Sequence, residues 1–169
     1  MKIAVISDTH WQPSQPLPKA LQLLAEQQPD LLLHAGDWTS LTLLEELRKI
    51  APVRGVAGNC DPEAEGRLLG YAKVVEAGPV RIGLTHGHLY GHLPLPAAAA
   101  RVFADEAKPL QAVVFGHSHV PCCEVQNGLL LFNPGSAHRP LGEIKKPSFG
   151  LLHISEDGQI KGEIIYFEK

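Results

Sequence analysis

Seven side chains with metal-binding chemistry follow apolar segments of the chain, and they are Asp8, His10, Asp37, Asn59, His86, His117 and His119. Imidazole nitrogens combined with carboxylate and amide oxygens suit divalent manganese, iron, cobalt, nickel or zinc. Seven ligands are too many for one tetrahedral ion, but they suit two ions that lie about 3.5–4 Å apart and share a carboxylate. Such a pair binds phosphate and lowers the pKa of a bridging water toward ~7, which makes hydroxide available at neutral pH.

Each motif alone has a simpler explanation. The Asp-x-His of residues 8–10 is commonly a capping pair in a loop, and Gly36-Asp37 is an ordinary turn sequence. Asn59 beside Gly58 suits a left-handed turn. The histidines at 117 and 119 fit one solvated face of a strand. Because every motif directly follows an apolar strand, the joint pattern favours the metal site over this sum of separate explanations.

The ligands follow five predicted strands, often beside a glycine. We expect these strands over residues 2–6, 30–34, 52–57, 79–85 and 111–115. The first is a β-branched run, KIAVI, which stops at Ser7-Asp8. In open α/β sheets the binding site lies at the carboxyl ends of the strands. The five loops are therefore expected to converge on one cleft.

Helices and further strands complete the predicted fold. We expect helices over 17–27, over 41–49 with Ser40 as its cap, and over about 96–107. Further strands are expected over 73–76, 121–126, 129–132, 149–154 and 159–167, with a tight turn at Asn127-Gly128. Strand–helix alternation predicts a parallel sheet in the first half, and the second half is predicted to be antiparallel. An α/β fold of two mixed sheets packed face to face with flanking helices, a four-layer α-β-β-α sandwich, buries both apolar strand faces.

Length and composition predict a single domain over residues 1–169. Hydrophobic residues make up 44% of the chain and charged residues 20%, which is enough apolar surface for a normal core. With a net charge of −3 we expect no binding to duplex nucleic acid. No apolar stretch reaches the ~18 residues that span a bilayer, and the first residues, MKIAVISD, lack the form of a signal peptide. We therefore expect a cytoplasmic protein without membrane contact.

Taken together, the motifs resemble those of the calcineurin-like metallophosphoesterase family. The resemblance covers the whole chain and rests on Asp8-Thr9-His10, Gly36-Asp37, Gly58-Asn59-Cys60-Asp61, His86-Gly87-His88, Gly116-His117-Ser118-His119 and Asn133-Pro134-Gly135-Ser136. The small size of the chain and its Gly-Asn-Cys-Asp motif are most similar to those of the compact bacterial and archaeal phosphodiesterase subgroup. The family fold, two mixed sheets with helices on both outer faces, agrees with the fold expected from the residues.

The resemblance implies a role for each motif residue. For the first ion the implied ligands are Asp8, His10 and His119. For the second they are Asn59, His86 and His117, and Asp37 bridges the two ions. A metal-activated hydroxide would then attack phosphorus in line, and both ions would stabilise the added charge. The expected cofactors are two divalent ions, manganese first, with iron, nickel, zinc or cobalt as alternatives. The expected substrate is a small-molecule phosphodiester, and the subgroup also suggests a homodimer.

Two residues beside the ligands have open roles. Cys60 stands where many family members have a histidine near the leaving oxygen. A thiol, with an ordinary pKa of about 8.5, is a poorer proton donor than imidazole, which favours diesters with good leaving groups over monoesters. Alternatively, Cys60 only packs the loop. His88 either contacts the substrate phosphate or orients His86. The histidines that match no motif are expected to be structural or solvated, namely His34, His92, His138 and His153.

Two alternatives to a phosphodiesterase stay open at this point. The fold also resembles that of the retromer scaffold subunit, which implies a catalytically weak or inactive protein-interaction module. The complete ligand set of this chain favours the enzyme, whereas a binding module needs an exposed apolar patch. The candidates for such a patch are Trp11, Trp38, Leu93 and Leu95, which fit the rim of the active cleft equally well. The second alternative is another reaction at the same site, such as that of a nuclease, a cyclic-nucleotide phosphodiesterase or a protein phosphatase.

Overall fold

The first strand, β1 (Lys2–Ile6), shows how the layers of the molecule are arranged. In the computed structural model, which describes residues 1–168, residues 3–6 of this strand are buried. Ile3 and Val5 face a core between two sheets, whereas Ala4 and Ile6 face a second core beneath helices. Burial on both faces is typical of a central strand that is covered by a layer on each side.

The first sheet has the strand order β10-β9-β1-β2-β3. Its strands β2 (Leu31–His34) and β3 (Val53–Gly55) continue the parallel register of β1, as the strand–helix alternation predicts. On the other side β9 (Ser148–Ile154) runs antiparallel to β1, and β10 (Ile160–Tyr166) runs antiparallel to β9. Register places Ile3 beside Leu31, so apolar side chains line the inner face of the sheet.

The second sheet has the order β4-β5-β6-β8-β7, with strands β4 (Ala72–Ala77), β5 (Val80–Thr85), β6 (Ala112–Val114), β7 (Cys122–Gln126) and β8 (Leu129–Asn133). The prediction that the second half is antiparallel is wrong for the centre of this sheet, since β5, β6 and β8 run parallel. Antiparallel pairs occur in its two hairpins, β4–β5 and β7–β8. The second hairpin turns at Asn127 and Gly128, both with positive φ, as an Asn-Gly sequence predicts.

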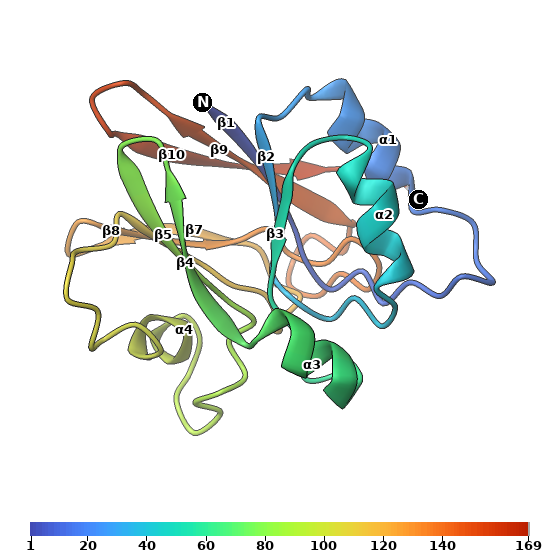
Figure 1. Cartoon of the computed structure of the whole chain (residues 1–169), viewed down its shortest axis with the longest axis horizontal. Coiled ribbons are helices and arrows are strands. Elements are labelled where there is room, and N and C mark those ends of the chain that lie inside the picture. The colour runs from blue at the N-terminus through green and yellow to red at the C-terminus, as the bar shows by residue number, and fades with distance from the viewer. Residues whose placement is uncertain (169) are drawn as a thin grey trace.

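Helices cover both outer faces of the sandwich. On the first sheet, α1 (Lys19–Glu26) and α2 (Thr42–Arg48) place Leu24, Leu43 and Leu47 in one apolar cluster with Ile6 of β1. On the second sheet, α4 (Ala97–Arg101) places Ala99 against β6 and β8. Figure 1 shows α1 and α2 on one side of the molecule and α4 on the other. The fold is therefore the predicted four-layer α-β-β-α sandwich.

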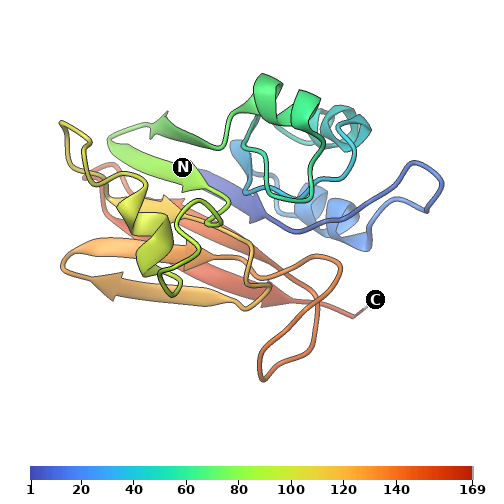
Figure 2. The same cartoon turned by 90° about the horizontal axis from the view of Figure 1, so that it is seen from below.

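Three helices differ from the sequence predictions. The N-cap of α2 is Leu41 instead of Ser40, and it has no side-chain cap. The helix expected over 96–107 ends at Arg101, after which the chain continues in tighter turns with hydrogen bonds between residues three apart. A third helix, α3 (Glu63–Leu69), was not predicted, because Gly66 at its centre lowers helix propensity. Figure 2 shows α3 beside α2, where the Leu41 N–H donates to Glu65 Oε1 at 3.3 Å.

Candidate metal centre

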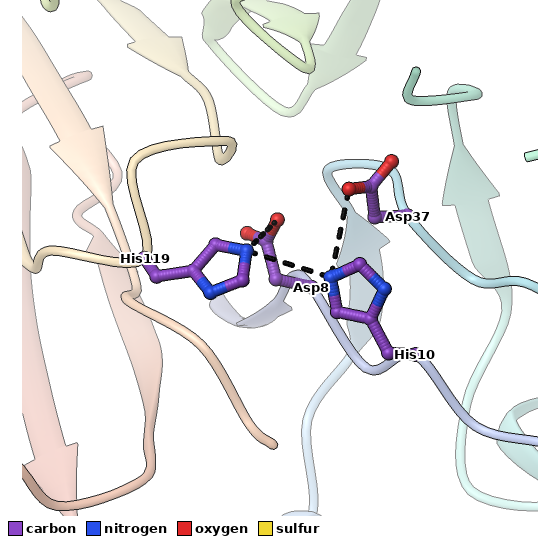
Figure 3. A group of neighbouring side chains, drawn as sticks. All are labelled: Asp8, His10, Asp37 and His119. Atoms are coloured by element: carbon purple, nitrogen blue, oxygen red, sulfur yellow. Dashed lines mark hydrogen bonds and ion pairs between the residues drawn. The ribbon is translucent and has the colours of Figure 1, made fainter. Parts of the chain in front are cut away.

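Ligand-type side chains gather where five strands end at one edge of the sandwich. The loops after β1 and β2 carry Asp8, His10 and Asp37, and the loop after β6 carries His117 and His119. Figure 3 shows that Asp8, His10, Asp37 and His119 point toward one another. Each of these four residues offers a ligand atom within 4.8 Å of the other three. We refer to these four residues as the compact group.

Distances within the compact group match those between neighbouring metal ligands. His119 Nε2 lies 3.2 Å from Asp8 Oδ1 and 3.4 Å from His10 Nε2. His10 Nε2 lies 3.6 Å from Asp37 Oδ2. Adjacent ligands of one ion with bonds of ~2.1 Å are separated by about 3–3.5 Å. The two imidazoles and two carboxylates are thus spaced to share one ion.

Two buried polar atoms at the centre lack hydrogen-bond partners among the described residues. They are Asp8 Oδ1 and His86 Nε2. His86 Nε2 lies 3.9 Å from Asp8 Oδ1 and 3.4 Å from Asp37 Oδ1. A buried polar group without a partner costs about 1–3 kcal/mol, and a cation between these atoms would satisfy both. The donor set therefore fits a divalent ion.

Backbone carbonyls fix the orientation of two ligand imidazoles. His86 Nδ1 lies 2.7 Å from the Ala35 carbonyl, and His119 Nδ1 lies 2.7 Å from the Arg139 carbonyl. A carbonyl only accepts, so each Nδ1 carries the proton and donates it. Each Nε2 is then left with a free lone pair directed at the carboxylates, which is the tautomer that metal ligation requires.

The remaining expected ligands form a looser set, which we call the open group: Asn59, His86 and His117. The ring centroids of His86 and His117 are 5.1 Å apart. Asn59 is exposed, and its amide donates to Cys60 Sγ at 3.4 Å. His88 lies next to this set, with its ring 5.5 Å from that of His86. The structure therefore brings the histidines together, and the Asn59 Nδ2 group donates to its neighbour Cys60.

Charges in the centre favour a cation. Burial alone would lower the pKa of His86, but Asp37 and Asp8 outweigh it and raise that pKa. The pKa of His119 is raised, chiefly by the Asp8 carboxylate, whose Oδ1 lies 3.2 Å from His119 Nε2. Burial raises the pKa of Asp37, yet His86 and the Cys60 N–H stabilise its carboxylate more strongly, so the net pKa lies well below the usual range. The carboxylates thus attract positive charge at the position where an ion would bind.

The ligand loops have unusual backbone conformations. Among residues 1–168, eight residues other than glycine have positive φ, and six of them lie in these loops: Asp8, His10, Asp37, Thr39, His117 and His119. A left-handed conformation is costly for such residues, on the order of 1–3 kcal/mol each, and it persists only where the surrounding structure enforces it. Because the left-handed conformation is concentrated around the candidate ligands, we infer that the packing of the site enforces the backbone of these loops.

Neighbouring glycines allow the loops to approach one another. Gly58 lies so close to Asp37 that a Cβ at this position would collide with Asp37 Oδ1. Gly36 has φ +97, and a Cβ there would lie 2.6 Å from His86 Nδ1. Both positions therefore require glycine, which explains why glycines stand beside the ligands in the sequence.

Asp61 organises the ligand loops, a role that was not predicted from the sequence. Its Oδ2 accepts the N–H groups of Asp37 at 3.0 Å and Gly58 at 2.7 Å. Its Oδ1 accepts the Thr39 N–H at 2.7 Å. One carboxylate therefore joins the loop after β2 to the loop after β3. An aspartate two residues after a Gly-Asn pair was the available signal, because such side chains commonly accept nearby backbone N–H groups.

The segment Asn133-Pro134-Gly135-Ser136 supports two other ligand loops. Asn133 Nδ2 donates to the Gly116 carbonyl at 2.8 Å, and Ser136 Oγ donates to the Asp8 carbonyl at 2.9 Å. Both residues are fully buried. The segment therefore connects the loop after β1 to the loop after β6, which gives this motif a structural reason to accompany the ligands.

Cys60 contacts the Asp37 carboxylate of the compact group. Its backbone N–H donates to Asp37 Oδ1 at 2.9 Å. Partial burial, a hydrogen bond to Asp37 and the nearby negative charges raise the pKa of the Cys60 thiol to about 11. The thiol therefore stays protonated at neutral pH, and its pKa is poorly matched to proton donation there.

Other aromatic residues have structural positions. His34 is fully buried, stacks on Trp38 at 3.5 Å between ring centroids, and lies 3.1 Å from Thr9 Oγ1, so its structural assignment is confirmed. Trp11 and Trp38 are 8% and 0% exposed. Their predicted contribution to an exposed apolar patch is therefore wrong, because both indoles belong to the core beneath α1 and α2.

Comparisons with known proteins agree with this geometry. A family model described as the calcineurin-like phosphoesterase superfamily domain matches residues 1–157. A protein of Methanothermobacter thermautotrophicus named "Probable metallophosphoesterase" is 34% identical over 98% of this chain and 92% of its own length. The phosphodiesterase YfcE of Escherichia coli K12 is 31% identical over 90% of this chain and 87% of its own length.

Solved structures show the same fold. Vps29 of Entamoeba histolytica, crystallised in complex with Zn²⁺, has a TM-score of 0.74 and 27% identity, with 99% of this chain and 100% of that chain covered. YfcE, described as a phosphoesterase from E. coli, has a TM-score of 0.66 and 28% identity, with 98% and 99% covered. Among the described residues, no helix is long and apolar enough to cross a membrane.

Proposed function

The chain belongs to the calcineurin-like phosphoesterase superfamily, and from this premise we propose that it is a metal-dependent phosphodiesterase with a dinuclear centre. The proposal rests above all on the compact group, in which four ligand atoms lie within 4.8 Å of one another. The name of YfcE, a phosphodiesterase, supports the choice of ester.

In this proposal the compact group and the open group each hold one divalent ion, and Asp37 bridges them. Asp37 suits that role because its Oδ2 faces His10 at 3.6 Å while its Oδ1 faces His86 at 3.4 Å. When bound, two divalent ions supply Lewis acidity to phosphoryl oxygens and an activated water for in-line attack. We propose manganese as the preferred ion, since mixed imidazole and carboxylate ligands accept it.

Residues beside the ions determine which esters react. His88 Nδ1 is buried without a hydrogen-bond partner among residues 1–168, so it is available to donate to a phosphoryl oxygen. Cys60, with its raised pKa, is a weak acid for a leaving oxygen. The combination favours diesters whose leaving groups need little protonation, and it disfavours monoesters.

A scaffold role, which the resemblance to the retromer subunit implies, is the second candidate, because Vps29 of Entamoeba histolytica shares the fold at 27% identity. The buried tryptophans disfavour this role, since they remove two members of the apolar patch expected for a partner.

The core between the two sheets contains residues from β1 to β9, which supports a single domain over residues 1–169. A cytoplasmic location and a small-molecule substrate belong to the same proposal, and the homodimer stays a prediction.

Hydrolysis of a chromogenic phosphodiester, measured on metal-stripped protein with and without added Mn²⁺, tests the proposal. We expect turnover that requires Mn²⁺ and exceeds turnover of the matching monoester. Metal-independent turnover would overturn the metal-dependent mechanism, and no turnover with Mn²⁺, Co²⁺, Ni²⁺, Fe²⁺ or Zn²⁺ would favour the scaffold.

A further inference from the structure

One arginine next to the compact group has no partner for its guanidinium. The chain has six arginines, and Arg139 is the one whose guanidinium makes no hydrogen bond, ion pair or ring contact within residues 1–168. The partners of the other five are glutamates, backbone carbonyls and a tyrosine ring: Arg48 and Arg67 bind glutamates, Arg81 binds two glutamates, Arg54 donates to Val53 O, and Arg101 lies over Tyr90.

The backbone of Arg139 is held against the ligand loops on both sides. Its N–H donates to Ser136 Oγ at 2.9 Å, and its carbonyl accepts from His119 Nδ1 at 2.7 Å. Ser136 in turn donates to the Asp8 carbonyl at 2.9 Å. Three hydrogen bonds therefore fix the Cα of Arg139 beside two residues of the compact group, while its side chain is exposed.

The charge of Arg139 is uncompensated beside the compact group. Its backbone is held next to His119 and, through Ser136, next to Asp8, while its guanidinium is exposed. An arginine fork that has no acidic partner within residues 1–168 is suited to an anion that approaches the metals from solvent.

We infer that Arg139 is a substrate-binding residue whose guanidinium binds a non-bridging phosphoryl oxygen of the phosphodiester. A phosphodiester carries its single negative charge on two such oxygens, and the planar fork of N–H donors in arginine matches that geometry. The inference rests on the proposed function, and it adds a protein cation to the metal ions as a determinant of phosphate binding. Arg139 then orients the ester from the His10–His119 side.

Inorganic phosphate is the probe, because its binding is measurable without turnover. We compare the wild-type chain with Arg139→Gln, Arg139→Lys and the matched surface control Arg54→Gln, all loaded with Mn²⁺, by calorimetric phosphate titration and by the KM for the chromogenic diester. Arg139→Gln should weaken phosphate binding at least about tenfold and raise KM by a similar factor, since a charged hydrogen bond is lost. The phosphate affinity and KM of Arg139→Lys should lie between those of the wild type and Arg139→Gln, and those of Arg54→Gln should match the wild type.

Metal content separates a substrate role from a structural one. The Mn²⁺ content of Arg139→Gln should equal that of the wild type, because the backbone bonds of residue 139 persist in this variant. Unchanged phosphate affinity and KM would overturn the inference, and so would loss of Mn²⁺ or a wild-type chain that binds no phosphate. If the wild type binds phosphate through Arg139 but hydrolyses no diester, the proposed function fails and the anion-binding role of Arg139 stands.

Discussion

The compact group and the open group differ in how firmly their ligands are held. In the compact group, Asp8 accepts the His117 N–H at 3.2 Å and His119 is fixed by the Arg139 carbonyl. In the open group, Asn59 is exposed, and within residues 1–168 its side chain bonds only its neighbour Cys60. Ligands fixed in advance lose little conformational freedom on binding. We therefore expect a tightly held ion in the compact group and an exchangeable one in the open group.

Asp37→Asn should have the largest effect, because Asp37 serves both groups. The amide keeps the shape but loses the charge that two ions share, and such ions supply several kcal/mol of transition-state stabilisation. Turnover of the chromogenic diester should fall by at least about a hundredfold. Circular dichroism should stay as in the wild type. A variant with wild-type turnover would show that neither group needs this bridge.

Paired histidine variants should separate the two groups. Calorimetric titration of the metal-free wild type with Mn²⁺ should show two binding events whose affinities differ by about tenfold or more, in line with the effect of ligand support. His119→Ala should remove the tighter event, and His117→Ala should remove the weaker one. If His117→Ala removed the tighter event instead, the assignment of the compact group as the stronger site would be wrong.

Ser136→Ala should lower the Mn²⁺ affinity of the compact group although it replaces none of the ligands. The variant loses the hydrogen bond to the Asp8 carbonyl and the acceptor for the Arg139 N–H. Residues that support ligands typically change metal affinity about 10–100-fold, so the tighter Mn²⁺ event should weaken by about tenfold. Ser155→Ala, in the turn between β9 and β10, is the matched control and should leave it unchanged. Equal affinity in both variants would limit Ser136 to a role in folding.

Cys60→Ser should have the smallest effect on a diester with a good leaving group. Because the thiol pKa is about 11, Cys60 contributes little proton transfer near pH 7, and turnover should change by less than about threefold. Cys60→His should instead increase turnover of esters with poor leaving groups. Rates measured on a series of leaving groups test both statements, and a large loss in Cys60→Ser would make Cys60 the acid.

Sequence patterns predicted the elements that carry the ligands better than the elements between them. Strand β1 and its loop were predictable because KIAVI is apolar on both faces and ends abruptly at polar residues. Helix α3 was not, because Gly66 lowers local helix propensity and tertiary contacts compensate, including the hydrogen bond from Leu41 to Glu65. The parallel pairing of β6 with β8 was equally hidden. In the sequence, β7 lies between these two strands and forms a hairpin with β8.

Within the site, residue types and order predicted the ligands, and long-range contacts decided their support. Residue order alone indicated that Asp8 and His119 share a site, because both follow apolar strands. Nothing local to Arg139 shows that its carbonyl accepts from His119, twenty residues earlier in the sequence. The role of Asp61 was hidden for the same reason, since two of its three N–H donors come from the loop after β2.

The candidate ligands come from both sheets: Asp8 and Asp37 follow strands of the first, and His86 and His119 follow strands of the second. An ion held between them is a cross-link between two layers that are otherwise joined by apolar packing and by hydrogen bonds between their loops, such as that of His86 to the Ala35 carbonyl. A ligand present at about a hundred times its Kd adds about 2.7 kcal/mol to stability. The availability of divalent ions would therefore set not only the activity of this chain but also how long each copy survives proteolysis.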